Sequence, residues 1–194
     1  MLTEKKLNIL ATLATTPFNE KTRQEIKTES KEKSNNTLQL AIAQFKKEQL
    51  VNERKVGKTA TYSLNMNNNR VHNYIALHSN EQLNKPVKQS VQHIIEEVKR
   101  TTVFFTVVIF GSYANNTQTK KSDLDIAIII PNNTEVKNIK RNTSTAELKS
   151  PLELDIHILT KQEMSTMLTN EEENLGKQIA KKHGVIHNPT IFYD

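Results

Sequence analysis

The sequence of 194 residues contains no cysteine. Disulfide bonds and zinc sites built on cysteine are therefore excluded, and this composition fits a reducing compartment. No run of apolar residues is long enough to cross a bilayer, and the first residues, MLTEKKLNILATL, lack the long apolar segment of a signal peptide. We therefore expect a soluble protein of the cytoplasm that has no membrane partner.

The excess of positive charge lies in the N-terminal third of the chain. The formal net charge is +6, and residues 1–70 hold 13 lysines and arginines against 7 acids, whereas residues 71–194 hold 14 of each. Such an asymmetry indicates a module that faces nucleic acid, although a general richness in lysine and asparagine is the alternative explanation. Hydrophobic residues make up 36% of the chain, which is enough for the core of one domain or of two small ones.

The first 66 residues have the pattern of three helices and a hairpin. Apolar residues recur at helical spacing in the first and third segments, and Gly57-Lys58 separates two extended runs, which is a hairpin signal. Thr15-Thr16-Pro17 is expected to end the first helix, and Ser34 or Asn35 is expected to cap the third. The expected elements are helices over residues 4–15, 21–28 and 35–48 and extended segments over 50–56 and 59–64.

This order of elements resembles a winged helix-turn-helix domain, covering residues 1–66. In that family the third helix enters the major groove of DNA, the hairpin contacts the backbone, and dimers on two-fold operators are common. The resemblance implies DNA as a partner and a homodimer as one form of the protein, whereas a solvated surface or a protein contact is the alternative. The residues that would contact DNA are Lys31, Lys33, Asn35, Asn36, Gln39 and Lys46 on and before the third helix, and Arg54, Lys55 and Lys58 on the wing.

A polar stretch over residues 67–84 is expected to be a linker, part of it helical. The second module, residues 85–194, is expected to begin with a helix over 86–100 and to continue as strand, turn, strand, helix, strand and helices. The expected strands cover residues 102–110, 124–130 and 152–160, and the last helices cover 161–169 and 171–184.

Three acids fall on the strands of the second module. Asp123 and Asp125 stand two residues apart at the start of one strand and so share a face, and Asp155 lies on the polar face of the next strand. Because clustered carboxylates repel one another unless a cation neutralises them, the pattern predicts a Mg²⁺ site. Gly111-Ser112 follows a strand end and can bring backbone and hydroxyl groups to a phosphate. These parts favour metal-assisted phosphoryl or nucleotidyl transfer, whereas an isolated acid pair would only cap a turn.

The motif resembles the nucleotidyltransferase fold of the DNA polymerase β superfamily, and IFGSYA and SDLDIAI are similar to its minimal prokaryotic members. The resemblance covers about residues 85–185 and implies an α+β fold with a small mixed sheet, an NTP donor, expected to be ATP, and Mg²⁺. It implies that Ser112 and the backbone of Gly111 hold the β- and γ-phosphates. It further implies that Asp123 and Asp125 bind two Mg²⁺ ions and that Asp155 helps to bind a metal and orients or deprotonates the attacking hydroxyl.

One part of the motif departs from the family. Many relatives continue with Ala-Arg-Gly, whereas this chain has Ala114-Asn115-Asn116. Two functions therefore stay open. The first is Mg²⁺-dependent transfer of NMP to a hydroxyl of a protein, an RNA or a small molecule, in an antitoxin-like regulator with a toxin as partner. The second is a DNA-binding transcriptional regulator whose second domain only binds nucleotide.

Overall fold

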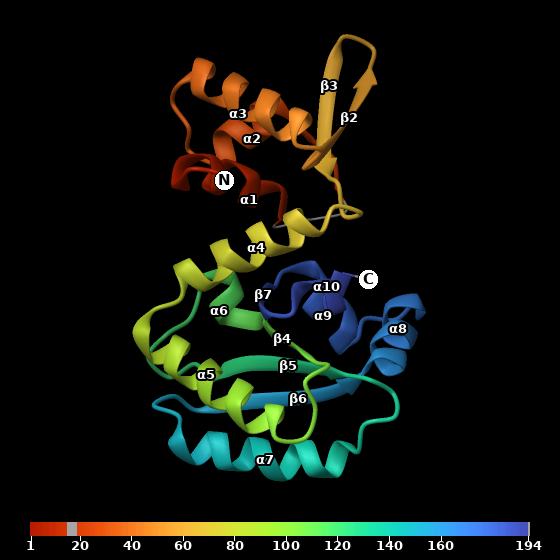
Figure 1. Cartoon of the computed structure of the whole chain (residues 1–194). Helices are drawn as coiled ribbons and strands as arrows, with labels where there is room; N and C mark the ends of the chain where they lie inside the picture. The colour runs from red at the N-terminus through yellow and green to blue at the C-terminus, as the bar shows by residue number, and fades with distance from the viewer. Residues whose placement is uncertain (15–18, 194) are drawn as a thin grey trace. The chain divides into compact units, whose positions relative to one another are not determined.

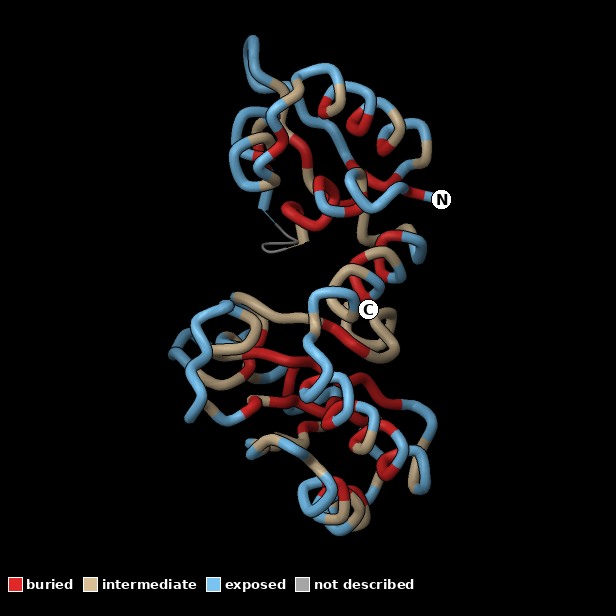
Figure 2. Tube along the Cα trace, turned by 90° about the vertical axis from the view of Figure 1, so that its left-hand side faces the viewer, coloured by how far each residue is buried: buried red, intermediate tan, exposed pale blue. Residues whose placement is uncertain are grey.

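The chain divides into two compact units, Met1–His78 and Ser79–Asp194. The computed structural model describes residues 1–14 and 19–193, so the predicted helix end at Thr15-Thr16-Pro17 lies outside it (Figure 1). Buried positions gather inside each unit (Figure 2). Within the described ranges, we find no helix that combines the length and the apolar character needed to span a bilayer.

Helices and a small antiparallel sheet build the first unit. The sheet has the strand order β1-β3-β2. The predicted helices and the predicted hairpin are confirmed, whereas the two-residue strand β1 was not predicted. The elements are α1 Glu4–Ala14, β1 Lys21–Thr22, α2 Arg23–Glu29, α3 Asn35–Lys47, β2 Val51–Val56, β3 Thr59–Leu64 and α4 Asn69–Gln82, which begins in this unit and crosses the predicted linker.

Helix α3 forms where the sequence places a cap before an apolar stripe. The Ser34 hydroxyl accepts a hydrogen bond from the Thr37 amide at 3.2 Å, which settles the cap between the two predicted candidates. The buried side of α3 follows the helical period, so that the opposite side is left for other contacts. Its buried residues are Leu38, Ala41, Ile42 and Phe45.

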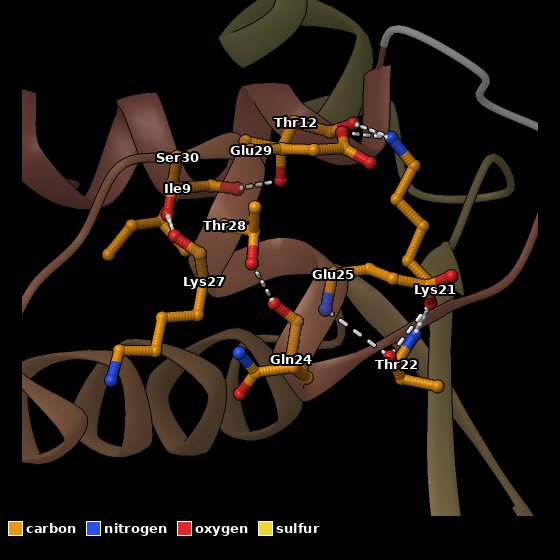
Figure 3. A network of polar contacts seen from close by, with 10 residues as sticks. All are labelled: Ile9, Thr12, Lys21, Thr22, Gln24, Glu25, Lys27, Thr28, Glu29 and Ser30. Carbon is orange, nitrogen blue, oxygen red and sulfur yellow. Dashed lines mark hydrogen bonds and ion pairs between the residues drawn. The ribbon is translucent and has the colours of Figure 1, made fainter.

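A buried lysine ties the first two helices together (Figure 3). Lys21 is 8% exposed, and its ammonium donates to the Thr12 carbonyl at 2.6 Å and pairs with Glu29. A buried ammonium is costly unless it is paired, so this network fixes α2 against the end of α1. Thr22 and Glu25 close a capping box at the start of α2, which sets where the turn toward α3 lies.

A mixed four-stranded sheet forms the centre of the second unit, in the order β6-β5-β4-β7. β5 and β6 are parallel, and β4 pairs antiparallel with both β5 and β7. The predicted α+β class with a mixed sheet is confirmed. The elements are α5 Lys85–Lys99, β4 Thr106–Ile109, α6 Gly111–Asn115, β5 Leu124–Ile130, α7 Val136–Lys149, β6 Leu154–Thr160, α8 Lys161–Thr169, α9 Leu175–Lys181, β7 Gly184–His187 and α10 Pro189–Tyr193.

Helices cover both faces of this sheet (Figure 1). Leu124, Ile126 and Ile128 pack with α5 and α7 on one face, whereas Ala127 and Ile129 pack with α8, α9 and α10 on the other. Because side chains alternate along a strand, Asp125 belongs to the second face. The near-continuous apolar run of β5 is thus explained by burial on both sides.

The sheet differs from the prediction at its edges. Residues 102–105 are not part of β4, and Val103 and Phe104 are 61% and 67% exposed, because the pairing with β5 begins only at Thr106. The strand β7 was missed, and the segment 171–174 before α9 is not helical. The turn expected at Gly111-Ser112 is the first turn of the short helix α6.

Candidate active site

Two of the three predicted acids lie directly opposite each other. In the parallel register of β5 and β6, Asp125 pairs with Asp155. Asp123 precedes β5 by one residue, so the prediction that it lies on the strand is corrected; it is exposed, while Asp125 is half-buried. The fold therefore brings Asp125 and Asp155, 30 positions apart in the sequence, together at the first ends of β5 and β6, beside the last residues of β4.

Gly111 packs against the carboxylate of Asp125. Its φ is +63°, and a Cβ at this position would overlap Asp125 Oδ2 and stand 2.7 Å from Asp125 Cγ. The Phe110 amide donates to the Asp125 carbonyl at 3.2 Å, which holds the two backbones side by side. A residue with a side chain would meet both the strain of a left-handed backbone and this overlap, so the position requires glycine.

Ser112 presents an unused hydroxyl next to this contact. Its Oγ is buried and has no hydrogen-bond partner within the part of the chain that the structure describes. Buried hydroxyls are nearly always satisfied, and those that are not require an explanation, such as a ligand that is absent. The predicted phosphate-holding residue thus has a free donor at the site.

Burial and the neighbouring acids disfavour the charged form of the Asp125 carboxyl group. Burial raises the pKa of its carboxyl group, and the neighbouring Asp155 and Asp123 raise it further. The Ser112 backbone amide and the His157 imidazole act in the opposite direction on the same pKa. The raised pKa marks a carboxylate that lacks sufficient positive charge nearby, as expected where a cation or a ligand completes a site.

His157 joins the site through Asp155. Its Nε2 lies 3.2 Å from Asp155 Oδ2, and its ring packs against Phe110 with the centroids 5.7 Å apart. The sequence motif of Gly111-Ser112 and the three acids does not include this histidine. The signal that identifies it is its position two residues after Asp155 on a strand, which places both side chains on one face.

The loop at Ala114-Asn115-Asn116 turns at a left-handed residue. Asn116 ends α6 in the left-handed conformation, with φ 55° and ψ 35°. Asparagine adopts this conformation more readily than other residues with a side chain, and glycine adopts it freely. Asn115 is exposed and neutral, so the loop lacks the arginine charge but retains the turn.

The donor set of the site fits a hard divalent cation. Carboxylate oxygens are the ligands that Mg²⁺ prefers, and the Ser112 hydroxyl, which has no partner among the described residues, leaves a polar group for a phosphate. The side chains as they stand form no ready cage: within residues 1–14 and 19–193, no three acidic or histidine side chains group closely enough to hold a metal ion. A substrate phosphate would therefore have to supply the remaining ligands, as is usual for Mg²⁺.

Two open cavities adjoin Asp123. The larger, of about 730 Å³, lies toward the end of α7, and the smaller, of about 470 Å³, lies toward Lys120 and Lys121. Both are lined by Asp123, Pro151 and Glu153. The exposed acid therefore stands at the rim of space that is open to solvent.

The predicted DNA-contacting residues are dispersed over α3, its approach and the wing. Three of them are engaged within the first unit: Asn35 Oδ1 accepts from Lys27 at 2.7 Å, Lys46 pairs with Glu53, and Arg54 lies 3.4 Å from Glu20. The other predicted residues are exposed, and none of their side chains takes part in an ion pair among the described residues. These residues are Lys31, Lys33, Asn36, Gln39, Lys55 and Lys58.

Comparison with known proteins assigns the second unit to a family. The family described as Nucleotidyltransferase domain matches residues 91–187, half of the chain, and the chain belongs to this family. Among curated proteins, the protein adenylyltransferase MntA of Shewanella oneidensis is 33% identical over 73 residues, which are 38% of this chain and 51% of MntA. The chain thus spans about half the length of the curated relative that it matches. No solved structure gives a significant match.

Proposed function

We propose that the second unit transfers NMP from an NTP, with ATP as the expected donor, to a hydroxyl group of an acceptor. The observation that carries the proposal is the packing of Gly111 on Asp125 with Asp155 opposite in register. Membership of the nucleotidyltransferase family and similarity to a protein adenylyltransferase support it. Among the acceptors that the chemistry allows, a protein, an RNA or a small molecule, the similarity favours a protein.

Each residue of the proposed site has a role that follows from its position. The Gly111 backbone and the Ser112 hydroxyl hold the triphosphate, because the hydroxyl is unused and lies beside the acids. Asp155 orients the acceptor hydroxyl and accepts its proton, and His157 holds the Asp155 carboxylate from the side. The transition state of such a transfer requires mainly placement and charge neutralisation, so few other groups are needed.

Asp123 and Asp125, with Asp155, are the residues that would hold Mg²⁺. When bound, the ion neutralises charge on the phosphates and on the attacking and leaving oxygens. Burial, and to a lesser degree Asp155 and Asp123, raise the pKa of Asp125, which supports the proposal because a cation would favour the charged carboxylate.

Label transfer tests this function directly. The full chain is incubated with each α-³²P-labelled NTP, Mg²⁺ and host lysate, and labelled products are separated by size and by nuclease or protease digestion. Transfer that is lost in Asp123→Asn and Asp155→Asn, but kept in the exposed-acid control Glu172→Gln, supports the proposal. Absence of transfer with all four nucleotides, together with nucleotide binding, would leave the second candidate, a regulator whose second unit only binds nucleotide.

We propose further that residues 1–66 are a winged helix-turn-helix domain that binds DNA, joined by the segment 67–84 to the transferase domain 85–194. The order of α1, α2, α3 and the β2–β3 hairpin supports it, as does the excess of positive charge in residues 1–70. An enzyme that both modifies a partner and binds DNA suits an antitoxin-like regulator, as a homodimer on a two-fold site, in the cytoplasm. Binding to duplex DNA that weakens steeply with salt would support the DNA-binding role, and salt-independent or absent binding would refute it.

A further inference from the structure

The outward side of α3 has an unusual composition. Five of the seven exposed residues of α3 fall within an arc of about 100°, opposite the buried stripe, and the other two, Asn35 and Lys46, lie beside this arc. Leu40 is a large apolar side chain that takes no part in the core, and it is 56% exposed. The outward side, called here the α3 face, consists of Asn36, Gln39, Leu40, Ala43 and Lys47.

Unpaired positive charge surrounds the α3 face. Among the described residues, ion pairs engage five of the thirteen basic side chains of the first unit, so that eight remain. Seven of these eight lie on α2, in the turn before α3, at the end of α3, or on the wing. They are Arg23, Lys27, Lys31, Lys33, Lys47, Lys55 and Lys58, and a polyanion such as duplex DNA is the partner that matches them.

The arginines of the first unit are not available to read bases. All three that its sequence contains are bonded inside the unit: Arg23 donates to the Asn35 carbonyl at 2.9 Å, Arg54 pairs with Glu20, and Arg70 pairs with Glu48. Guanine is most often recognised by arginine or lysine, through its O6 and N7 atoms. The α3 face has no arginine, and its one lysine, Lys47, lies in the last turn of the helix.

What the α3 face does offer matches A·T pairs. The amides of Asn36 and Gln39 can bond the N6 and N7 atoms of adenine, and Leu40 and Ala43 offer apolar contact to the thymine methyl group. We infer that the α3 face reads A·T-rich sequence in the major groove, with Gln39 and Leu40 as the residues that set specificity. This inference rests on the proposed DNA-binding function of the first unit.

Duplexes of matched length test the inference with the full, unmodified chain. Fluorescence anisotropy compares an A·T-rich pool, a G·C-rich pool and an A·T-rich pool in which deoxyuridine replaces thymidine, all at one salt concentration. We expect the A·T-rich pool to bind about tenfold or more tightly than the G·C-rich pool, and the loss of the thymine methyl groups to weaken binding several-fold. Equal affinity for the three pools would overturn the inference while leaving DNA binding itself intact.

Variants then assign the contacts. Leu40→Ala should reduce the difference between thymidine and deoxyuridine duplexes, and Gln39→Arg should shift preference toward the G·C-rich pool. Gln89→Arg, which adds the same charge at an exposed site on α5, should leave the preference unchanged. Failure of every pool to bind at low salt would refute both the inference and the DNA-binding role. Self-association of the chain that Leu40→Ala abolishes would refute the inference and assign the α3 face to a protein contact.

Discussion

Gly111 and Asp125 are in contact in a way that leaves no room for a side chain at position 111. The glycine has a left-handed backbone, and the space in which a Cβ would stand is occupied by the Asp125 carboxylate. The turn proposed to hold phosphate and the proposed metal ligand Asp125 therefore fix each other's position.

The variant Gly111→Ala should lower both stability and activity. We expect a loss of about 2 kcal/mol or more in the free energy of unfolding, because backbone strain and overlap add together. Urea unfolding followed by circular dichroism measures the first effect, and label transfer measures the second. Gly57→Ala, also at positive φ but with open space around it, should show only the strain. Equal losses in the two variants would contradict the role of the Asp125 contact.

Asp125→Asn should separate stability from function. Burial raises the pKa of Asp125, so its ionisation destabilises the fold. The stability that the protonated carboxyl group contributes is present below the ordinary carboxyl pKa, and it is lost as pH rises through the pKa in the folded state. The variant should thus melt at a higher temperature than the natural protein at neutral pH, while label transfer falls by about a hundredfold or more. The gain should shrink in acid. A lower melting temperature at neutral pH would show that the carboxylate stabilises the fold instead.

The left-handed residue at the end of α6 gives a test of the altered loop. Asn116→Gly should change the free energy of unfolding by less than about 1 kcal/mol and keep activity, since glycine accepts this conformation freely. Asn116→Val should destabilise by about 1–2 kcal/mol, because a β-branched residue is strained there. Chemical denaturation of the two variants side by side measures this, and equal stability would rule out a conformational role for Asn116.

His183 should make the second unit sensitive to mild acid. Its ring accepts or donates hydrogen bonds at 3.0 Å to Ile179 and Tyr193, and burial lowers its pKa to about 4. Stability is then fully present above the ordinary pKa of 6.5 and is lost as pH falls toward 4, by on the order of 2 kcal/mol. His183→Gln should flatten this slope in denaturation curves between pH 7 and pH 4. Burial lowers the pKa of His187 as well, so part of the slope should persist.

Ligand binding should stabilise the protein only when metal and nucleotide are present together. Because nucleotide phosphates would complete the coordination of Mg²⁺, we expect either ligand alone to shift the melting temperature little. At a hundred times its dissociation constant, a bound non-hydrolysable NTP should add about 2.7 kcal/mol. Differential scanning fluorimetry measures the shift, and Asp123→Asn should abolish its dependence on Mg²⁺. A full shift with nucleotide and chelator would argue against a metal in the site.

The pattern of single segments predicted most of the fold. Period and capping located α3 and narrowed its cap to Ser34 or Asn35, and the apolar run 124–130 located β5. The wrong or missing strand predictions concern segments whose pairing strand lies far away in the sequence. The β-rich run at Val103 and Phe104 finds no neighbouring strand, whereas the short segment GVIH at 184–187 becomes a strand because β4 offers it an open edge. Propensity alone carries no information about such pairings.

The acids of the site were recognisable in the sequence, whereas their supporting contacts were not. The spacing of the acids placed Asp125 and Asp155 on polar faces of their strands. The close contact of Gly111 with Asp125 depends on how β4 and β5 align. The contact of His157 with Asp155 and the left-handed turn at Asn116 likewise depend on details of geometry. These features depend on backbone angles and on how closely two segments approach each other. The residue types limit these quantities but do not determine them.

The parallel pairing of Asp125 with Asp155 also has a consequence for synthesis of the chain. Parallel strands need a crossover, and here it is α7, which must pack before β6 can align with β5. A nascent chain that has emerged only as far as β5 carries the glycine turn and one pair of acids, but not the residue proposed to activate the acceptor. The proposed site is therefore incomplete until β6 has docked beside β5.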